Sequence, residues 1–195
     1  MTSPFDQMSW LNPPPSTSLA AGTLQVTTHD RTDFWRRTFY GFTRDTGHFL
    51  HQTVTGDFTV AVTVQGDYTT LYDQAGLMLR LSDTHWIKAG IEHTDGAPVF
   101  STVVTNGWSD WATMALPFDA ATIRLRLTRH AEAILVQVAH PDGHWIMARL
   151  AYLPPEIPAQ IGIMACSPER SGFTARFSGF TLGPAIPRTL HEDHP

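Results

Sequence analysis

The sequence predicts an all-β fold, built as a two-sheet antiparallel jelly-roll sandwich. Short β-like runs follow one another at the 8–12-residue spacing typical of sandwiches, and turn residues separate them. No stretch of about a dozen residues carries a convincing 3.6-residue apolar period. Roughly a dozen such runs exceed the strand number of an immunoglobulin-like domain, which favours a larger jelly roll.

The expected strands follow an N-terminal segment that cannot form a helix. Asn12-Pro13-Pro14-Pro15-Ser16 contains three consecutive prolines, which lack the backbone N–H that a helix needs. Alternating runs start at Leu24, and Gly66-Asp67, Asn106-Gly107 and Pro141-Asp142-Gly143 are turn sequences between them. Residues 71–76 allow at most one helical turn. We expect strands at residues 58–64, 86–92, 99–105, 123–129, 133–139, 145–152, 160–165 and 173–182.

The length and composition suit one domain. The chain has 195 residues, of which 42% are hydrophobic, and its 11 Phe and 6 Trp are ample for a sizeable core. We expect a single domain over residues 1–183 and a polar, loose C-terminal tail over residues 184–195. Cys166 is the only cysteine, which excludes an intrachain disulfide framework, and it is expected to be a buried small hydrophobe.

The charge pattern argues against nucleic acid and membrane as partners. The formal net charge is −5, Lys88 is the only lysine, and the arginines are dispersed, whereas a sequence-independent nucleic-acid binder needs clustered cations. Neither a signal peptide nor an apolar run of about 18 residues is visible. The default expectation is therefore a cytoplasmic location.

Residues 86–92 carry the most informative pattern in the chain. Ile87, Ala89 and Ile91 point to one side of the expected strand, because successive side chains leave opposite faces of a sheet. The other side carries Trp86, Lys88, Gly90 and Glu92. An aromatic ring, a cation, a glycine without a side chain and a carboxylate along one side of a strand indicate a face that binds a polar ligand.

Several motifs together resemble one known family. The chain resembles the domain-of-unknown-function family described as "regulation of enolase protein, concanavalin A-like", over about residues 8–183. The resemblance implies a concanavalin A-like jelly roll with a concave and a convex face, and it implies little about chemistry. The motifs are Trp10-Leu11-Asn12-Pro13-Pro14, Thr32-Asp33-Phe34-Trp35-Arg36-Arg37-Thr38, Tyr40-Gly41-Phe42, Asp45-Thr46-Gly47-His48, Tyr72-Asp73-Gln74-Ala75-Gly76, Trp86-Ile87-Lys88-Ala89-Gly90-Ile91-Glu92, Ser109-Asp110-Trp111 and Cys166-Ser167-Pro168.

A polar cluster on the concave face is the strongest candidate site. Gln74 begins the strand of Leu77 and Leu79, and Lys88 and Glu92 lie about 13 Å apart on the next strand. If these strands and that of Ser101 pair in order, Gln74, Ser101 and either Lys88 or Glu92 converge across neighbouring strands. Such groups beside a Trp suit sugar hydroxyls. The alternatives are an internal salt-bridge network under a covering loop, or a solvated face.

A second cluster contains Asp33, Trp35 and Arg36, with Asp45 and His48 nearby. In one interpretation a mobile loop brings Trp35 or Arg36 to the ligand, and the fork of Arg36 suits anionic groups. In the other, which turn chemistry slightly favours, Asp33 or Asp45 pairs with the arginines and pins the loop.

The segment after Asn106-Gly107 is a candidate ligand rim. Trp108 and Trp111 flank Asp110, whose carboxylate could sit at the edge of a cleft, although Trp111 is equally compatible with the core. No Gly-x-Ser-x-Gly elbow supports Ser109 as a nucleophile.

Catalysis has weaker support than binding. Glu92 is a weak candidate for a catalytic acid or base, since no Glu-x-Asp-x-Glu series follows it. A second carboxylate from another strand, such as Asp73 or Asp110, would have to complete a glycosidase pair.

The 10 histidines invite a metal hypothesis. His140 and His144 flank Pro141-Asp142-Gly143 and can face each other across a hairpin mouth. The others are scattered without a cysteine or carboxylate cluster at ligand spacing, so surface histidines and no metal or cofactor are expected.

The sequence thus favours a binding module for a carbohydrate or similar small polar ligand on the concave sheet. A carbohydrate-active enzyme using Glu92 and a protein-interaction or regulatory module, anchored by Trp108 and Trp111, are the alternatives. A homodimer is compatible with the sandwich edges. The candidate ligand-binding residues are Gln74, Trp86, Lys88, Glu92, Ser101, Trp35, Arg36 and Asp110.

Overall fold

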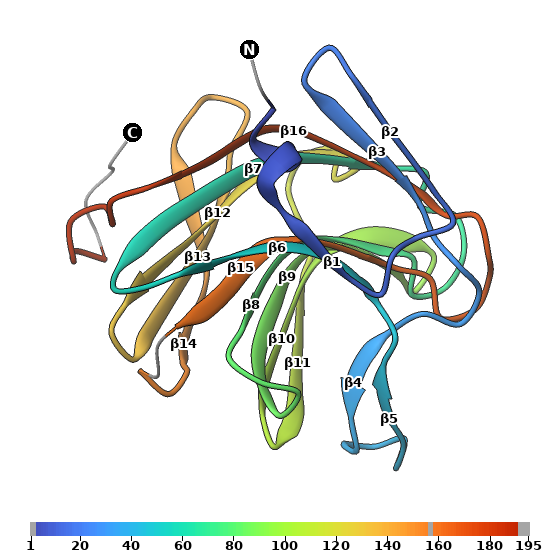
Figure 1. The fold of residues 1–195 in the computed structure, drawn as a ribbon, viewed down its shortest axis with the longest axis horizontal. Helices are drawn as coiled ribbons and strands as arrows, with labels where there is room; N and C mark the ends of the chain where they lie inside the picture. Colours follow the sequence, from blue (N-terminus) through green and yellow to red (C-terminus); the bar gives the residue numbers. More distant parts are fainter. Residues whose placement is uncertain (1–2, 156–157, 191–195) are drawn as a thin grey trace.

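The computed structural model describes residues 3–155 and 158–190, which form two large antiparallel sheets packed face to face (Figure 1). The first sheet contains, in spatial order, β1 (Ser9–Leu11), β6 (His48–Val54), β15 (Ala159–Cys166), β8 (Gln74–Arg80), β9 (His85–Thr94), β10 (Ala97–Asn106) and β11 (Trp108–Met114). The second contains β14 (Trp145–Tyr152), β13 (Ala133–Ala139), β12 (Thr122–His130), β7 (Phe58–Gly66), β16 (Thr174–Gly183), β3 (Thr23–Thr27) and β2 (Ser16–Ala20). The all-β sandwich is confirmed.

The main core lies between the two sheets. Ile87, Ala89 and Ile91 of β9 point into it and share one apolar cluster with Val62 of β7 and Leu125 of β12. Burial of alternate β-branched and aliphatic side chains from both inner faces is what holds a sandwich together. The strict alternation expected for residues 86–92 is therefore confirmed, and Lys88 and Glu92 lie on the opposite, outer face of the first sheet.

All eight strands expected by range are present, although their ends differ by a few residues. The N-terminal third holds strands that those ranges omit, including β1, β2 and β3, because three- to five-residue strands carry too little alternation to be recognised. The described residues contain one helical element, the 3-10 turn η1 (Pro4–Gln7). Residues 71–76 form no helix; they turn and enter β8 at Gln74.

Two short strands, β4 (Phe34–Arg36) and β5 (Thr43–Asp45), form a separate ribbon at the lower right of Figure 1. The ribbon packs on the outer face of the first sheet, where Phe34 and Trp35 join a second apolar cluster with Met78 and Trp86. Gly47 permits this approach, since a Cβ there would lie 2.3 Å from the Phe34 ring and 2.6 Å from Cys166 Sγ.

The described part of the C-terminal tail contacts the sandwich. The Ile186 backbone N–H donates to Thr59 Oγ1 at 3.0 Å, and Arg188 pairs with Glu132 at 3.0 Å. Residues 186 and 188 of the expected tail thus contact the sandwich, and residues 191–195 lie outside the described part. Within residues 3–155 and 158–190, no helix has the length and apolar character needed to cross a membrane.

Candidate functional site

The outer face of the first sheet brings together polar residues from three consecutive strands. β8, β9 and β10 pair in sequence order, as the candidate site required. Gln74 lies directly opposite Glu92, and Ser101 lies opposite Gly90. The strands approach so closely at Gly90 that a Cβ there would lie 2.1 Å from the Ala75 carbonyl oxygen. The sheet between Lys88 and Glu92 therefore presents bare backbone.

Lys88 is buried on this face and pairs with the ribbon. Its Nζ lies 3.1 Å from Asp33 Oδ1, and the two side chains are 5% and 11% exposed. Burial disfavours the charge of Lys88, but the nearby carboxylates of Asp33 and Glu92 contribute to a net rise in the pKa of the ammonium group. Lys88 is thus a cation at neutral pH, and Asp33 is its counter-ion.

Glu92 is held by two donors from the neighbouring strands. Ser101 Oγ donates to Glu92 Oε2 at 2.5 Å, and the Trp111 indole N–H donates to the same oxygen at 3.0 Å. Burial raises the pKa of the Glu92 carboxyl, and attraction to Lys88 offsets part of that rise. The carboxyl group is therefore fixed in position while its proton affinity is increased.

The polar groups of this site keep hydrogen-bonding capacity that the described residues do not use. The Lys88 ammonium has three N–H donors and spends one on Asp33. Glu92 Oε1, Asp33 Oδ2 and Gln74 Oε1 accept no hydrogen bond from any described residue, since Gln74 uses only its amide N–H, toward Tyr72 O. Three N–H donors, two of Lys88 and one of Gln74, and three acceptors thus remain for a ligand or for water.

A small pocket and a wider groove lie over these groups. The inner pocket has a volume of about 40 Å³, room for roughly three waters at about 10–15 Å³ each. The outer groove has a volume of about 560 Å³ and shares Trp35, Tyr40 and Trp111 with the pocket. The inner pocket is lined by Asp33, Trp35, Tyr40, Phe42, Tyr72, Gln74, Lys88, Glu92, Val103 and Trp111.

The loop between β4 and β5 forms one wall of this pocket. Tyr40 packs edge-on against Trp35 and stacks on Phe42, and its hydroxyl lies 2.7 Å from the Tyr72 hydroxyl. Phe39 in the same loop is 94% exposed and has a positive φ of 62°. Non-glycine residues at positive φ cost free energy and are enriched at functional sites.

Trp86 requires a correction. Its side chain is 1% exposed, and the Phe34 ring lies edge-on to it at 6.2 Å, so it offers no stacking surface to a ligand. The ribbon seals this half of the outer face. Trp111 and Trp35 supply the indole rings that reach the pocket instead.

Arg36 and Asp110 also lie elsewhere than expected. Arg36 donates to the Gly107 carbonyl at 3.2 Å and lies 3.8 Å from Asp83, so it fastens the ribbon to a turn and does not reach the inner pocket. Asp110 borders the outer groove, but its carboxylate pairs with Arg149 of β14 at 3.0 Å. Along β11, the side chains of even-numbered and odd-numbered residues point to opposite faces of the sheet. Asp110 therefore points toward the second sheet, whereas Trp111 points to the outer face.

The structure places Gln74, Ser101 and both Lys88 and Glu92 around one small hollow, where either Lys88 or Glu92 was expected, and it adds further residues to the site. One interpretation paired Asp33 or Asp45 with the arginines at positions 36 and 37, whereas Asp33 pairs with Lys88 and Asp45 with Arg80. Trp111 was compatible with either rim or core. Trp111 alternates in step with Ser109 and Thr113, and these residues pair with the outward-facing residues of β10. This alternation could have indicated that Trp111 points outward. Tyr40, Phe42 and Tyr72 lie in loops, where periodicity carries no information.

Two further expectations concern single residues. Cys166 is fully buried against Phe34, and burial raises the pKa of its thiol, so it is a small hydrophobe and not a nucleophile. Asp73, a suggested partner of Glu92 in catalysis, is fully buried and held by Arg170 at 2.6 Å. Asp73 does not line the pocket.

Known proteins share this chain's sequence and fold. A family model described as "Protein of unknown function (DUF1349)" matches residues 10–185. The "Regulation of enolase protein 1" of Saccharomyces cerevisiae is 45% identical over 188 residues, 96% of this chain and 95% of that protein. A crystal structure of a functionally unknown protein from Saccharomyces cerevisiae has a TM-score of 0.90 and 45% identity, with 95% of this chain and 100% of that chain covered.

More distant structures share the fold alone. The GH43 protein BlXynB from Bacillus licheniformis gives a TM-score of 0.68 at 16% identity, covering 92% of this chain and 38% of that chain. A lectin from Bauhinia forficata in complex with GalNAc gives 0.59 at 10% identity, covering 91% and 92%. These neighbours confirm the lectin-like jelly roll, and the match over residues 10–185 shows that the chain belongs to the DUF1349 family of proteins of unknown function.

Proposed function

We propose that the protein is a binding module for a carbohydrate or a similar small polar ligand. The ligand lies in the outer groove and inserts one polar substituent into the inner pocket. The observation that carries this proposal is the meeting of unused donors and acceptors on Lys88, Glu92, Asp33 and Gln74 beneath a ring of aromatic side chains.

The hydrogen-bonding groups match a hydroxyl group. A hydroxyl donates one hydrogen bond and accepts up to two, so it can use both a carboxylate oxygen and the Lys88 ammonium. Bonds to charged partners are stronger than bonds between neutral groups. An inner pocket of about 40 Å³ admits such a substituent but not a whole sugar ring.

The aromatic side chains match the rest of a sugar. Trp111 is 37% exposed, Tyr40 is 41% exposed, and both border the pocket and the groove. Aromatic rings supply large, rigid apolar surfaces, against which the C–H face of a pyranose can pack. The Bauhinia forficata lectin, which has the same fold, is in complex with GalNAc, and this supports a sugar as the ligand class.

Calorimetric titration with a panel of neutral, acidic and amino sugars tests the proposal. We expect at least one sugar to bind the full chain, and Trp111→Ala to weaken that sugar's affinity by about tenfold or more, which is about 1.4 kcal/mol. Gln74→Ala should weaken it as well, through the loss of one acceptor.

Trp108→Ala is the matched control. Trp108 lies three residues away on the same strand and is 58% exposed, but it borders neither the pocket nor the groove and stacks with Arg37 instead. We expect its replacement to leave the affinity within about twofold of the original. Absence of binding across the panel, or equal losses in the Trp108 and Trp111 variants, would refute the proposal.

A second candidate function, a carbohydrate-active enzyme, rests on the raised pKa of Glu92. A carboxyl group with increased proton affinity is suited to act as a general acid. The second carboxylate in the pocket is Asp33, and it is neutralised by Lys88, which makes a glycosidase pair less favourable. Turnover of aryl glycosides that disappears in Glu92→Gln, with sugar binding retained, would establish this activity over simple binding.

A further inference from the structure

The turn between β13 and β14 lies far from the pocket in sequence and gathers two histidines and an aspartate. His140-Pro141-Asp142-Gly143-His144 closes with a backbone hydrogen bond from His140 N–H to His144 O at 2.8 Å, and Gly143 N–H donates to His140 O at 2.9 Å. Gly143 has a φ of 102°, which residues with a side chain rarely adopt. The backbone therefore fixes residues 140 and 144 opposite each other.

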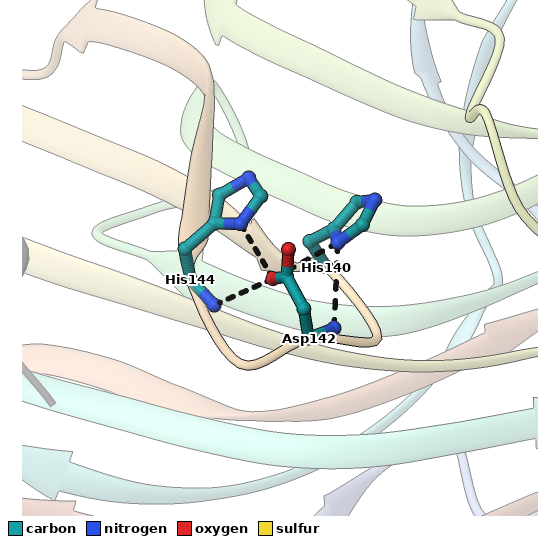
Figure 2. A group of neighbouring side chains, drawn as sticks. All are labelled: His140, Asp142 and His144. Atoms are coloured by element: carbon teal, nitrogen blue, oxygen red, sulfur yellow. Dashed lines mark hydrogen bonds and ion pairs between the residues drawn. The ribbon is translucent and has the colours of Figure 1, made fainter.

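The side chains of this turn converge on one point. Figure 2 shows the Asp142 carboxylate between the two imidazole rings, with one oxygen facing the Nδ1 atoms of both. Asp142 Oδ1 lies 2.9 Å from His140 Nδ1 and 2.5 Å from His144 Nδ1. The rings stack with centroids 4.6 Å apart, and the edge contact with Phe118 at 5.3 Å also orients His140.

The side chains of the turn are of the kinds that bind metal cations. The Asp142 side chain is exposed, and its Oδ1 also accepts the His144 backbone N–H at 3.2 Å. Imidazole is the commonest metal ligand among protein side chains, and it binds through a ring nitrogen. The two imidazoles and the carboxylate of this turn supply three ligand atoms.

We propose that His140, Asp142 and His144 form a binding site for a divalent transition-metal ion, with Zn²⁺ as the representative case. Imidazole and carboxylate ligands are the set that Zn²⁺ and its neighbours use, whereas Mg²⁺ and Ca²⁺ prefer oxygen ligands alone. Sequence spacing favoured surface histidines here, because it could not show that the Asp142 side chain turns back between the rings.

The distances are close to those a metal requires. One ligand atom from each residue can be chosen so that all three lie within 4.8 Å of one another. A tetrahedral Zn²⁺ with bonds of about 2.0–2.2 Å holds its ligands about 3.3 Å apart. Side-chain rotations of about an ångström at this turn would close the difference, because both His144 and Asp142 are exposed.

The site would retain an open coordination position. Three protein ligands leave the fourth position of a tetrahedral ion to water or to another donor. A hollow of about 310 Å³ adjoins His140 and is lined in part by Phe118, Asp119 and Arg124. This hollow offers space for a ligand next to His140.

Calorimetric titration of the full chain with ZnCl₂ at pH 7.5 tests the proposal. We expect one equivalent of Zn²⁺ to bind with micromolar affinity, and MgCl₂ to give no saturable heat. His140→Ala and His144→Ala should each weaken Zn²⁺ binding by at least about tenfold, and Asp142→Asn should weaken it to a smaller extent. With Co²⁺ as the probe, a tetrahedral absorption spectrum in the original chain should disappear in His144→Ala.

His29→Ala is the control for a histidine outside the turn. The rings of His29 and His48 are also near each other, at 5.7 Å, but His48 already uses both ring nitrogens on backbone partners. Replacement of His29 should leave the Zn²⁺ affinity unchanged. Zn²⁺ binding that is weaker than millimolar, or that survives in the His140→Ala/His144→Ala double variant, would overturn the proposal. Thermal unfolding of each variant checks that the fold is retained.

Discussion

The β4–β5 ribbon divides the outer face of the first sheet into two halves. In the sealed half, Phe34 covers Trp86, and Asp45 of the ribbon pairs with Arg80 through two hydrogen bonds of 2.7 and 2.8 Å. In the open half, Glu92 and Gln74 face a pocket bordered by Trp111. Lys88 lies at the boundary and pairs with Asp33 at the start of the ribbon.

The two halves contain the same kinds of residues, but in one half they stabilise the fold and in the other they are available to a ligand. The ribbon places an aromatic ring over the sealed half, so its polar groups bind one another and the surface contributes stability. In the open half the polar groups keep unused hydrogen-bonding capacity, which costs stability when buried but serves a ligand. Substitutions in the sealed half should therefore change stability most, and substitutions in the open half should change binding most.

The largest effect is expected for Phe34→Ala. Phe34 is fully buried between Trp86, Met78 and Cys166, and its truncation leaves a cavity that the ribbon cannot fill. We expect the free energy of unfolding to fall by about 3–5 kcal/mol in urea denaturation. Phe39→Ala, at a side chain that is 94% exposed, should change it by less than about 0.5 kcal/mol. Similar values for the two variants would show that the ribbon does not seal this half.

Lys88→Met should have the next largest effect on stability. Removal of the ammonium leaves the Asp33 carboxylate without its counter-ion, and we expect a loss of about 3 kcal/mol in the same assay. The double variant Lys88→Met/Asp33→Asn removes both charges and should recover part of this loss. Sugar binding should be lost as well. A Lys88→Met protein with unchanged stability and unchanged binding would show that Lys88 neither stabilises the fold nor binds the ligand.

Acid should weaken the contacts by which His48 holds Asn12 and His29, two residues that precede the ribbon in the chain. His48 Nδ1 lies 2.7 Å from Asn12 O, and its Nε2 accepts the His29 backbone N–H at 3.0 Å, so the neutral ring is required. Burial lowers the pKa of His48 below 6.5, so the unfolded chain binds the proton first and stability falls as the pH drops below about 6.5.

Thermal unfolding at pH 7.5 and at pH 5.5 measures this effect. We expect a lower midpoint at pH 5.5 in the original chain and a smaller difference between the two conditions in His48→Gln. His51, whose pKa is also lowered by burial, should preserve part of the acid sensitivity in that variant. A pH difference that His48→Gln leaves unaltered would assign the sensitivity to other groups.

Apart from the exposed Phe39, the smallest change in stability is expected in the open half. Trp111→Phe removes the indole N–H that bonds to Glu92 Oε2 and Ser101 Oγ, each at 3.0 Å, but Ser101 still donates to Glu92. We expect a loss of about 0.5–1.5 kcal/mol in urea denaturation. A loss as large as that of Phe34→Ala would indicate that the pocket is a structural network and not a binding site.

The alternation of residues 86–92 was sufficient to predict the face on which Lys88 and Glu92 lie. Pairing of consecutive strands then predicted the approach of Gln74 and Ser101, since hairpins place neighbours in the chain beside each other in the sheet. The roles of Trp86 and Arg36 could not be predicted in this way. Their surroundings depend on where the ribbon packs, and no local periodicity encodes that position.

The sequence by itself therefore determined the all-β sandwich and the polar character of one face, because side-chain alternation and turn chemistry are local properties of the chain. Only the tertiary structure decided which polar groups are neutralised and which stay unused. Asp33 and Lys88 are 55 residues apart in the sequence, and they meet because the ribbon crosses the sheet at that point. The same holds for Tyr40 and Tyr72, whose contact across the pocket joins two loops that share no strand pairing.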